Sequence, residues 1–347
     1  MEEKIDVLMA TYNGEKYVKS QIDSILNQTY KNLNLIILDD KSKDKTVAIL
    51  KEYENKDKRV KVYINDENLG STKTFEKLLS YVKSDYFMFS DQDDIWYEDK
   101  IKKSYNFLKE KNFDMIYTDL EVYTRNDDGY KLISNSFNKL KNLKYKQIKY
   151  SDYRLELLYN TITGSTILCK SKYISKLVPF PDNKDLIHDA WIGLYMSLKY
   201  KIGYLDVPTV KYMQHENNQI GSGKYTDRFN KFSDVRNHFI NVKLSRFNTI
   251  LENKDRLLSD DLNIEDTCNE AILYFNHLKN KKIINFKYLN VFIKLYKWDS
   301  FKFILLQNAI LNIPFISSFI YKFKKRKWEN NGRKKTRNNS RRRYNKN

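Results

Sequence analysis

The stretch Tyr86-Phe87-Met88-Phe89-Ser90-Asp91-Gln92-Asp93-Asp94 decides how this chain folds and where its functional site lies. Four apolar residues, a pattern typical of a buried β-strand, run almost directly into three carboxylates within four positions. Carboxylates this close repel one another and lose hydration, so a compensating partner is expected. Mg²⁺ and Mn²⁺ prefer such oxygen ligands and usually take the remaining ones from phosphates and water. The alternative is an acidic turn that caps a helix beginning near Tyr97.

Around this stretch, short apolar runs alternate with segments of helical period. The strands are expected at 5–10, 33–38, 60–64, 86–90 and 115–120, and the helices at 16–27, 46–53, 71–82 and 97–109. Repeated strand–helix units predict an α/β fold, Rossmann-like, with a mostly parallel sheet and helices on both faces. Ligands of such sheets bind beyond the carboxyl ends of the strands.

Four polar loops follow four of these expected strands, at 11–14, 39–42, 65–70 and 91–93. One polar loop is ordinary, whereas four at one edge of a sheet predict a binding site. The first loop has no G-x-G-x-x-G dinucleotide motif, and no P-loop motif occurs in the chain.

Charge and cysteine content limit the function classes. The 347 residues carry a net charge of +19, and residues 321–347 hold 13 Lys/Arg against one acid. No nucleic-acid reading module accompanies this charge, so no nucleic-acid partner is expected. Two cysteines argue against a disulfide scaffold or a Cys-based zinc site. The first residues lack a signal-peptide pattern, which predicts a cytoplasmic location.

The chain is expected to have three parts. Residues 1–225 form the α/β domain, 226–321 a helical C-terminal region, and 322–347 a basic, disordered tail. Residues 301–321 are apolar but too interrupted for a transmembrane span. An interfacial helix followed by basic residues would place the protein on an anionic membrane surface, the inner face of the cell membrane. A helical hairpin packed on the α/β domain is the alternative.

Six motifs together carry a family resemblance. They are Met-Ala-Thr-Tyr-Asn-Gly at 9–14, Leu-Asp-Asp-Lys-Ser at 38–42, Asn-Leu-Gly at 68–70, Ser-Asp-Gln-Asp-Asp-Ile-Trp at 90–96, His-Asp-Ala-Trp at 188–191 and Gln-His-Glu-Asn-Asn at 214–218. In order and spacing the chain resembles family 2 glycosyltransferases of the GT-A fold. It is most similar to the bacterial rhamnosyltransferase-like branch that builds surface polysaccharides. The likeness covers roughly residues 4–222, and Lys41 and Ser165 depart from it, standing where Gly and Cys are frequent.

The resemblance implies an activity and its ligands. Such enzymes move a sugar from a nucleotide-diphosphate sugar to a hydroxyl of a growing glycan or lipid-linked acceptor, with inversion at the anomeric carbon. The expected donor is dTDP-rhamnose, or else a UDP-hexose, and the expected cofactor is Mg²⁺ or Mn²⁺. Residues implied in donor binding are Thr11, Tyr12, Asn13, Asp40, Asn68, Gly70, Asp91 and Gln92, with Asp40 bonding the nucleotide base. Residues implied in metal binding are Asp93, Asp91 and His215.

Inverting transfer also needs a base for the acceptor hydroxyl. Asp189, at the start of an expected helix, is the candidate, and helix capping is its alternative role. Candidates for the acceptor or sugar pocket are Trp96, Asp119, Thr163, Gly164, His188 and Trp191. Most of these have a plain structural alternative, such as core packing for Trp96 and a turn for Thr163 and Gly164.

Two competing functions remain open from sequence. A nucleotidyltransferase acting on sugar phosphates also uses an α/β sheet and paired aspartates, but usually carries a basic, Gly-rich phosphate loop that residues 11–14 lack. The other is a non-enzymatic protein that binds nucleic acid or membrane through its basic tail.

Overall fold

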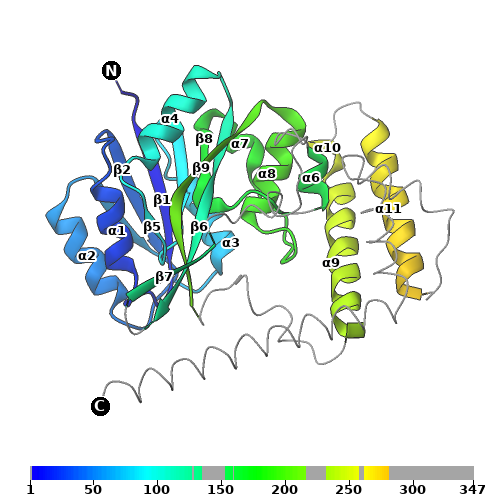
Figure 1. Ribbon diagram of the computed structural model, residues 1–347, viewed down its shortest axis with the longest axis horizontal. Helices are drawn as coiled ribbons and strands as arrows, with labels where there is room; N and C mark the ends of the chain where they lie inside the picture. Colours follow the sequence, from blue (N-terminus) through cyan, green and yellow to red (C-terminus); the bar gives the residue numbers. More distant parts are fainter. Residues whose placement is uncertain are drawn as a thin grey trace, which may run out of the picture. The chain divides into compact units, whose positions relative to one another are not determined.

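The computed structural model describes residues 2–126, 129–134, 153–158, 160–215, 232–257 and 262–280 (Figure 1). Its strands are β1 Ile5–Thr11, β2 Leu33–Asp39, β3 Val60–Ile64, β4 Tyr86–Ser90, β5 Ile95–Trp96, β6 Met115–Asn126, β7 Gly129–Ser134, β8 Ile167–Lys170 and β9 Ile202–Gln214. Its helices are α1 Val18–Leu26, α2 Thr46–Lys56, α3 Ser71–Leu79, α4 Lys100–Glu110, α6 Tyr153–Leu158, α7 Ile174–Leu177, α8 His188–Lys199, α9 Phe232–Glu252, α10 Lys254–Leu257 and α11 Leu262–Asn280.

The strands form one sheet in the order β3-β2-β1-β4-β8-β6-β9-β5, with β7 paired to β6. The pairs from β3 to β4 are parallel, as is β6 with β9, whereas β8 lies antiparallel between β4 and β6. The predicted α/β sheet is therefore confirmed, with an antiparallel strand inserted at its centre. The carboxyl ends of β1 to β4 lie at one edge, as the parallel order requires.

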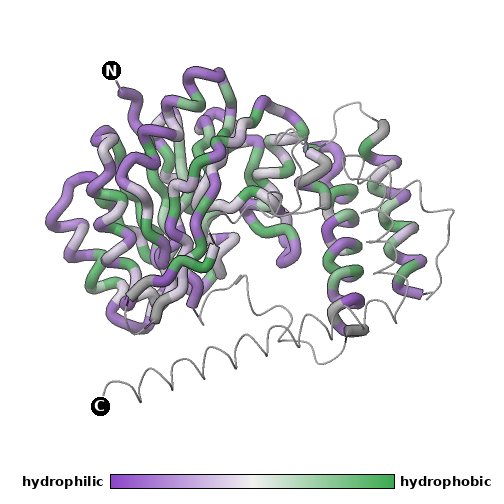
Figure 2. The backbone as a smooth tube through the Cα atoms, viewed as in Figure 1, coloured by the Kyte–Doolittle hydropathy of each residue, from purple (hydrophilic) through white to green (hydrophobic). Residues whose placement is uncertain are grey.

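Helices cover both faces of the sheet. On one face, apolar residues of α1, α2 and α4 pack with Val7, Leu35 and Met88 into a continuous core. On the other, Phe75 of α3 is buried edge-on against Phe89 of β4, with ring centroids 5.2 Å apart. Figure 2 shows apolar colour concentrated along the strands and polar colour along the loops. Strands buried on both faces explain the nearly unbroken apolar runs in the sequence.

The expected helices 16–27, 46–53 and 71–82 run over 18–26, 46–56 and 71–79. Two further differences follow from strand pairing. The helix predicted to begin at Tyr97 begins at Lys100, because Ile95 and Trp96 pair with Lys211 and Val210 as β5. The strand predicted at 115–120 runs on to Asn126 and pairs with a thirteen-residue β9. Both differences come from pairing with β9, about a hundred residues away, which local periodicity does not encode.

Two compact units divide the chain. One comprises residues up to 222 together with 249–262, and the other comprises 223–248 and the residues from 263 onward. Helix α10 thus belongs to the unit that holds the sheet. The expected boundaries at 225 and 321 stay predictions, and both the apolar stretch 301–321 and the tail lie outside the described residues. None of the helices in the described ranges is long and apolar enough to cross a membrane.

Candidate active site

The side-chain amide of Gln92 joins the loops that follow β1 and β4. Its Oε1 accepts a hydrogen bond from the Tyr12 backbone N–H at 2.9 Å, and its Nε2 donates to the Tyr12 carbonyl at 3.0 Å. A Cβ built on Gly14 would lie 2.2 Å from Gln92 Oε1, so a side chain there would displace the Gln92 amide from this position. Two of the predicted strand-end loops therefore meet, and Gln92 holds them together.

The loops after β1 and β2 are joined in the same way. The Thr11 hydroxyl donates to Asp39 Oδ2 at 2.7 Å. Asn13 donates its backbone N–H to Ser42 Oγ at 2.8 Å, and its Oδ1 accepts the backbone N–H of Lys43 at 2.8 Å. Thr11 and Asn13 are thus engaged in shaping the loops, whereas the side chain of Tyr12 is 39% exposed at this edge. Their contact with a donor stays a prediction.

The carboxylate of Asp40 organises the loop after β3. Its Oδ1 accepts from Asn65 Nδ2 at 2.9 Å and from the Leu69 N–H at 2.8 Å, and its Oδ2 accepts from the Gly70 N–H at 2.8 Å. Asn68 donates its side-chain amide to the Asp40 carbonyl at 3.1 Å. The side chain that the resemblance assigns to the nucleotide base is therefore buried as the anchor of the 65–70 loop. A direct bond from Asp40 to a base stays a prediction.

Lys41 stands where the family pattern has a frequent glycine, and its backbone conformation gives the reason for that glycine. Its φ of 63° lies in the left-handed region, where glycine is free of the Cβ clash that other residues meet. A glycine is frequent at this position for that reason. Here Lys41 Nζ donates to the Asp66 carbonyl, which gives the lysine a contact that glycine would lack.

Asp91, Asp93 and Asp189 form one electrostatic cluster. Burial, as the largest cause, and the neighbouring carboxylates of Asp93 and Asp189 together raise the pKa of the Asp91 carboxyl to about 7. Coulomb repulsion weakens with distance and is screened beyond about 10 Å, so Asp189 lies close to the Asp-x-Asp segment. The structure thus brings together carboxylates that are almost a hundred residues apart.

His215 lies against Asp93. Its Nε2 is 2.8 Å from Asp93 Oδ2, and its ring stacks on Tyr17 with centroids 4.4 Å apart. His215 and Asp93 line a shallow pocket that is open to solvent, and Tyr17 and Asp94 form part of its walls. His215 is the residue directly after β9, so the long β9 strand carries it to the end of β4.

The donor set fits a divalent cation that a diphosphate helps to hold. Among the described residues, no group of three or more His, Cys, Asp or Glu side chains is arranged to bind a metal on its own. Mg²⁺ and Mn²⁺ sites that act on phosphates commonly take only one or two carboxylates from the protein. Burial and the carboxylates of Asp93 and Asp189 raise the pKa of Asp91, and a cation bound at the same place would favour its charged form.

Asp189 is held at the start of α8. Its Oδ1 accepts from Asn160 Nδ2 at 3.0 Å and from the Ala190 N–H at 2.6 Å, and its Oδ2 accepts from the Gly164 N–H at 3.2 Å. The first-turn position gives it the helix-dipole contact expected of a structural residue. The hydrogen bonds from Asn160 and Gly164, which come from another segment, also fix the direction of its carboxylate.

Two of the candidate acceptor residues share a second cavity. Asp119 and Thr163 line a space of about 220 Å³ together with Thr118 and Tyr204. Gly164, next to Thr163, leaves room for His188, because a Cβ there would lie 2.9 Å from His188 Nε2.

The remaining candidates are interior side chains. Trp96 is 3% exposed within the core, and Trp191 is fully buried and donates its indole N–H to the Leu177 carbonyl at 2.9 Å. His188 is 7% exposed and stacks on Phe75, and burial lowers its pKa. These placements favour packing, the structural alternative for Trp96, over direct contact with a sugar.

Sequence reasoning missed two polar residues of this region. Asn160, which contacts Asp189, precedes the quoted Thr-Gly turn, but no spacing rule marks it. Asp94 is 1% exposed, and burial, with Asp93 and Asp91 nearby, raises its pKa well above the usual range. The position of Asp94 in the opening acidic run was the one available signal.

Comparison with known proteins decides the family. A family model described as "Glycosyl transferase family 2" matches residues 6–173. A protein of Haemophilus influenzae described as an uncharacterized glycosyltransferase is 30% identical over 200 residues, 58% of this chain and 75% of its own length. The chain belongs to glycosyltransferase family 2. Another relative of this family 2 glycosyltransferase is a dTDP-rhamnosyl transferase, RfbG, of Shigella flexneri, 29% identical over 69% of this chain and 82% of that protein.

Solved structures agree on the fold of this family 2 glycosyltransferase. Residues 1–349 of TarS from S. aureus, in complex with UDP-GlcNAc, superpose with a TM-score of 0.54 at 15% identity, covering 92% of this chain and 89% of that one. The mannosyltransferase PcManGT from Pyrobaculum calidifontis, solved with GDP-Man and Mn²⁺, gives 0.52 at 12%, covering 90% and 88%. The expected GT-A architecture is confirmed, and family membership removes both the nucleotidyltransferase and the non-enzyme alternatives.

Proposed function

We propose that this protein is a metal-dependent, inverting glycosyltransferase of bacterial surface polysaccharide biosynthesis. It moves a sugar from a nucleotide-diphosphate donor to a hydroxyl of a growing glycan, which is either free or linked to a lipid. The observation that carries the proposal is the electrostatic proximity of Asp189 to Asp91, since it sets a candidate base beside a candidate diphosphate site.

The donor proposed first is dTDP-rhamnose, and a UDP-hexose is second. The relative described as a dTDP-rhamnosyl transferase supports the first choice. The structural neighbours solved with UDP-GlcNAc and GDP-Man support a nucleotide-diphosphate sugar in general. Exposed Tyr12 and Leu69 flank the Asp40 loop and offer apolar surface to a nucleotide base.

The transfer step requires a base aimed at the acceptor oxygen. In the proposed mechanism Asp189 takes the proton of the acceptor hydroxyl while that oxygen attacks the anomeric carbon from the face opposite the leaving diphosphate. Asn160 and Gly164 contribute by fixing the carboxylate in one orientation before the acceptor arrives. The acceptor would enter from the side of the cavity lined by Asp119 and Thr163.

The departing diphosphate carries negative charge that needs a partner. Asp93 and His215, with Asp91, would hold a Mg²⁺ or Mn²⁺ ion, which when bound neutralises the charge of the leaving group. The residues also separate the two tasks, because Asp93 lies against His215 and Asp189 is held by Asn160 and Gly164.

Contact of the basic tail with an anionic membrane stays part of the proposal, and deletion of residues 322–347 tests it.

The test begins with the donor. Binding stabilises a folded protein by an amount that grows with the logarithm of the ligand concentration relative to Kd, so a thermal-shift panel at equal donor concentrations ranks the donors. The panel contains dTDP-rhamnose, UDP-glucose, UDP-N-acetylglucosamine and GDP-mannose, each with and without Mn²⁺. We expect dTDP-rhamnose with Mn²⁺ to give the largest shift.

The second stage removes the base. Asp189→Asn keeps the shape of the side chain but not its basicity, so transfer should fall at least about 100-fold while the donor shift is retained. Asp182→Asn, at an exposed position of the preceding loop, is the matched control. Full transfer by Asp189→Asn, or loss of donor binding with transfer chemistry intact, would refute the assignment of the base.

A further inference from the structure

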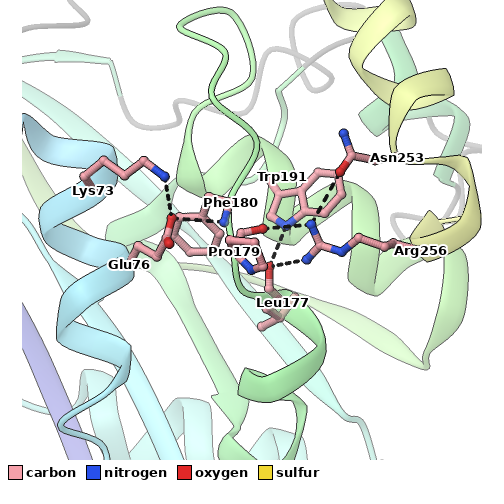
Figure 3. A network of polar contacts seen from close by, with 8 residues as sticks. All are labelled: Lys73, Glu76, Leu177, Pro179, Phe180, Trp191, Asn253 and Arg256. Carbon is pink, nitrogen blue, oxygen red and sulfur yellow. Dashed lines mark hydrogen bonds and ion pairs between the residues drawn. The ribbon is translucent and has the colours of Figure 1, made fainter.

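Arg256 of α10 binds the carbonyl end of α7. Its guanidinium donates to the Pro179 carbonyl at 2.8 Å and to the Leu177 carbonyl at 3.0 Å (Figure 3). It also donates to the Lys176 carbonyl at 3.3 Å. The last carbonyls of a helix lack partners within the helix, and an arginine fork satisfies several of them at once. Arg256, from the C-terminal part of the chain, thus anchors the segment that leads to α8.

The same guanidinium stacks on Trp191. Its Cζ lies 4.9 Å from the centroid of the indole ring, and the ring is fully buried. Trp191 donates its indole N–H to the Leu177 carbonyl at 2.9 Å, the oxygen that also accepts from Arg256. Arg256, Leu177 and Trp191 therefore form a closed triangle of polar and cation–π contacts.

The segment between α7 and α8 is pinned at two further points. The Phe180 backbone N–H donates to Glu76 Oε2 at 3.0 Å, and Lys73 pairs with the same oxygen at 3.2 Å (Figure 3). Asn183 donates its amide to Thr249 Oγ1 at 2.6 Å. Helix α3 thus holds one side of the segment, and residues 249–257 hold the other.

Trp191 and Asp189 both lie in the first turn of α8. The Trp191 backbone N–H donates to the Ile187 carbonyl at 2.9 Å and so closes this turn. In the same turn, Asn160 and the Gly164 N–H hold the Asp189 carboxylate by hydrogen bonds. We propose that Arg256 is a positioning residue for the base: through Trp191 and Leu177 it fixes the turn that carries Asp189.

This inference rests on the proposed role of Asp189, and it gives part of the C-terminal region a task. Residues 249–262 belong to the same compact unit as the sheet. The helical region that follows the family motifs is then partly a component of the catalytic unit, and truncation before Arg256 would disturb the acceptor side of the site.

The first experiment measures amide hydrogen exchange, which does not depend on the identity of the donor. In Arg256→Met the amide of Trp191 should exchange at least about tenfold faster than in the wild-type protein, since its turn loses an anchor. The matched control is Arg59→Met. Arg59 likewise donates to a helix-terminal carbonyl, that of Leu26 in α1, at a distance of 3.1 Å, and it also pairs with Asp57.

The second experiment separates positioning from stability. Arg256→Met should lower kcat at least about tenfold and leave the KM for dTDP-rhamnose within twofold, because the donor loops are untouched. Arg256→Lys should recover part of kcat, because it keeps a cation over Trp191 without the fork. It also serves as the working variant if Arg256→Met does not fold.

The outcomes distinguish the two proposals. If exchange at the Trp191 amide rises no more in the Arg256 variants than in Arg59→Met, the proposal that Arg256 fixes this turn is wrong. If Arg256→Met transfers at the rate of Arg59→Met while Asp189→Asn is inactive, the base stands and the positioning role falls. If Asp189→Asn keeps full transfer, the proposed base itself is wrong, and Arg256 positions no base.

Discussion

His215 Nε2 lies 2.8 Å from Asp93 Oδ2, although 122 positions separate the two residues in the chain. The contact exists because β9 runs parallel to β6 and ends at Gln214, one residue before His215. An imidazole and a carboxylate are both ligands of Mn²⁺, so the contact supports the proposal that this pair holds the cation.

Replacing Asp93 should weaken metal binding. We expect Asp93→Asn to lower the affinity for Mn²⁺ at least about tenfold in the presence of UDP or dTDP, because a charged ligand becomes neutral. Titration calorimetry measures this directly. Asp99→Asn, which removes an acid paired with Lys103 at 2.6 Å on α4, is the control and should leave the affinity unchanged. Unchanged Mn²⁺ affinity in Asp93→Asn would exclude Asp93 as a ligand.

A side chain at Gly14 should displace the Gln92 amide and lower stability. A Cβ at this position would come within 2.2 Å of Gln92 Oε1. Gly14→Ala should therefore lower the free energy of unfolding by about 1–3 kcal/mol, as overpacking does. The double variant Gly14→Ala/Gln92→Ala should be more stable than the sum of the single changes predicts, because the clash partner is gone. Additive losses in urea unfolding would mean that the two loops do not meet through this contact.

Lys100 makes stability depend on pH. Burial lowers its pKa from 10.5 to about 7, and Asp94 opposes that shift. Its Nζ lies 4.6 Å from the Trp96 ring centroid and donates to Thr209 Oγ1 at 3.2 Å. Between pH 7 and about 10.5 the Lys100 side chain is mostly protonated in the unfolded chain and mostly neutral in the folded one. The contribution of Lys100 to stability therefore rises with pH over this range and is least favourable below pH 7.

The corresponding variant is Lys100→Met, which keeps the length of the side chain and removes its charge. We expect its melting temperature to exceed that of the wild-type protein by a few degrees at pH 7, and the gap to shrink towards pH 10. Scanning calorimetry at both pH values measures the gap. A gap of equal size at pH 7 and pH 10 would contradict the lowered pKa.

Local sequence pattern was sufficient to predict the features of this protein that depend on nearby residues. The alternation of apolar and polar residues predicted β3 and β4 to the residue, because side chains of a strand point alternately to its two faces and buried runs are continuous. The parallel order then predicted that the loops after β1 to β4 share an edge, and the Gln92–Tyr12 and Asp40–Gly70 hydrogen bonds confirm it.

The partners across the sheet could not be predicted from local sequence pattern. Pairing of β5 with β9 moved the start of α4, carried His215 to Asp93, and buried Trp96, a candidate for sugar contact. The carboxylates of Asp40 and Asp189 found their hydrogen-bond partners in segments that no local pattern links to them. Such contacts depend on strand register and on burial, which follow from the packing of the whole domain. The opening acidic run thus predicted a site, and the fold chose the residues that complete it.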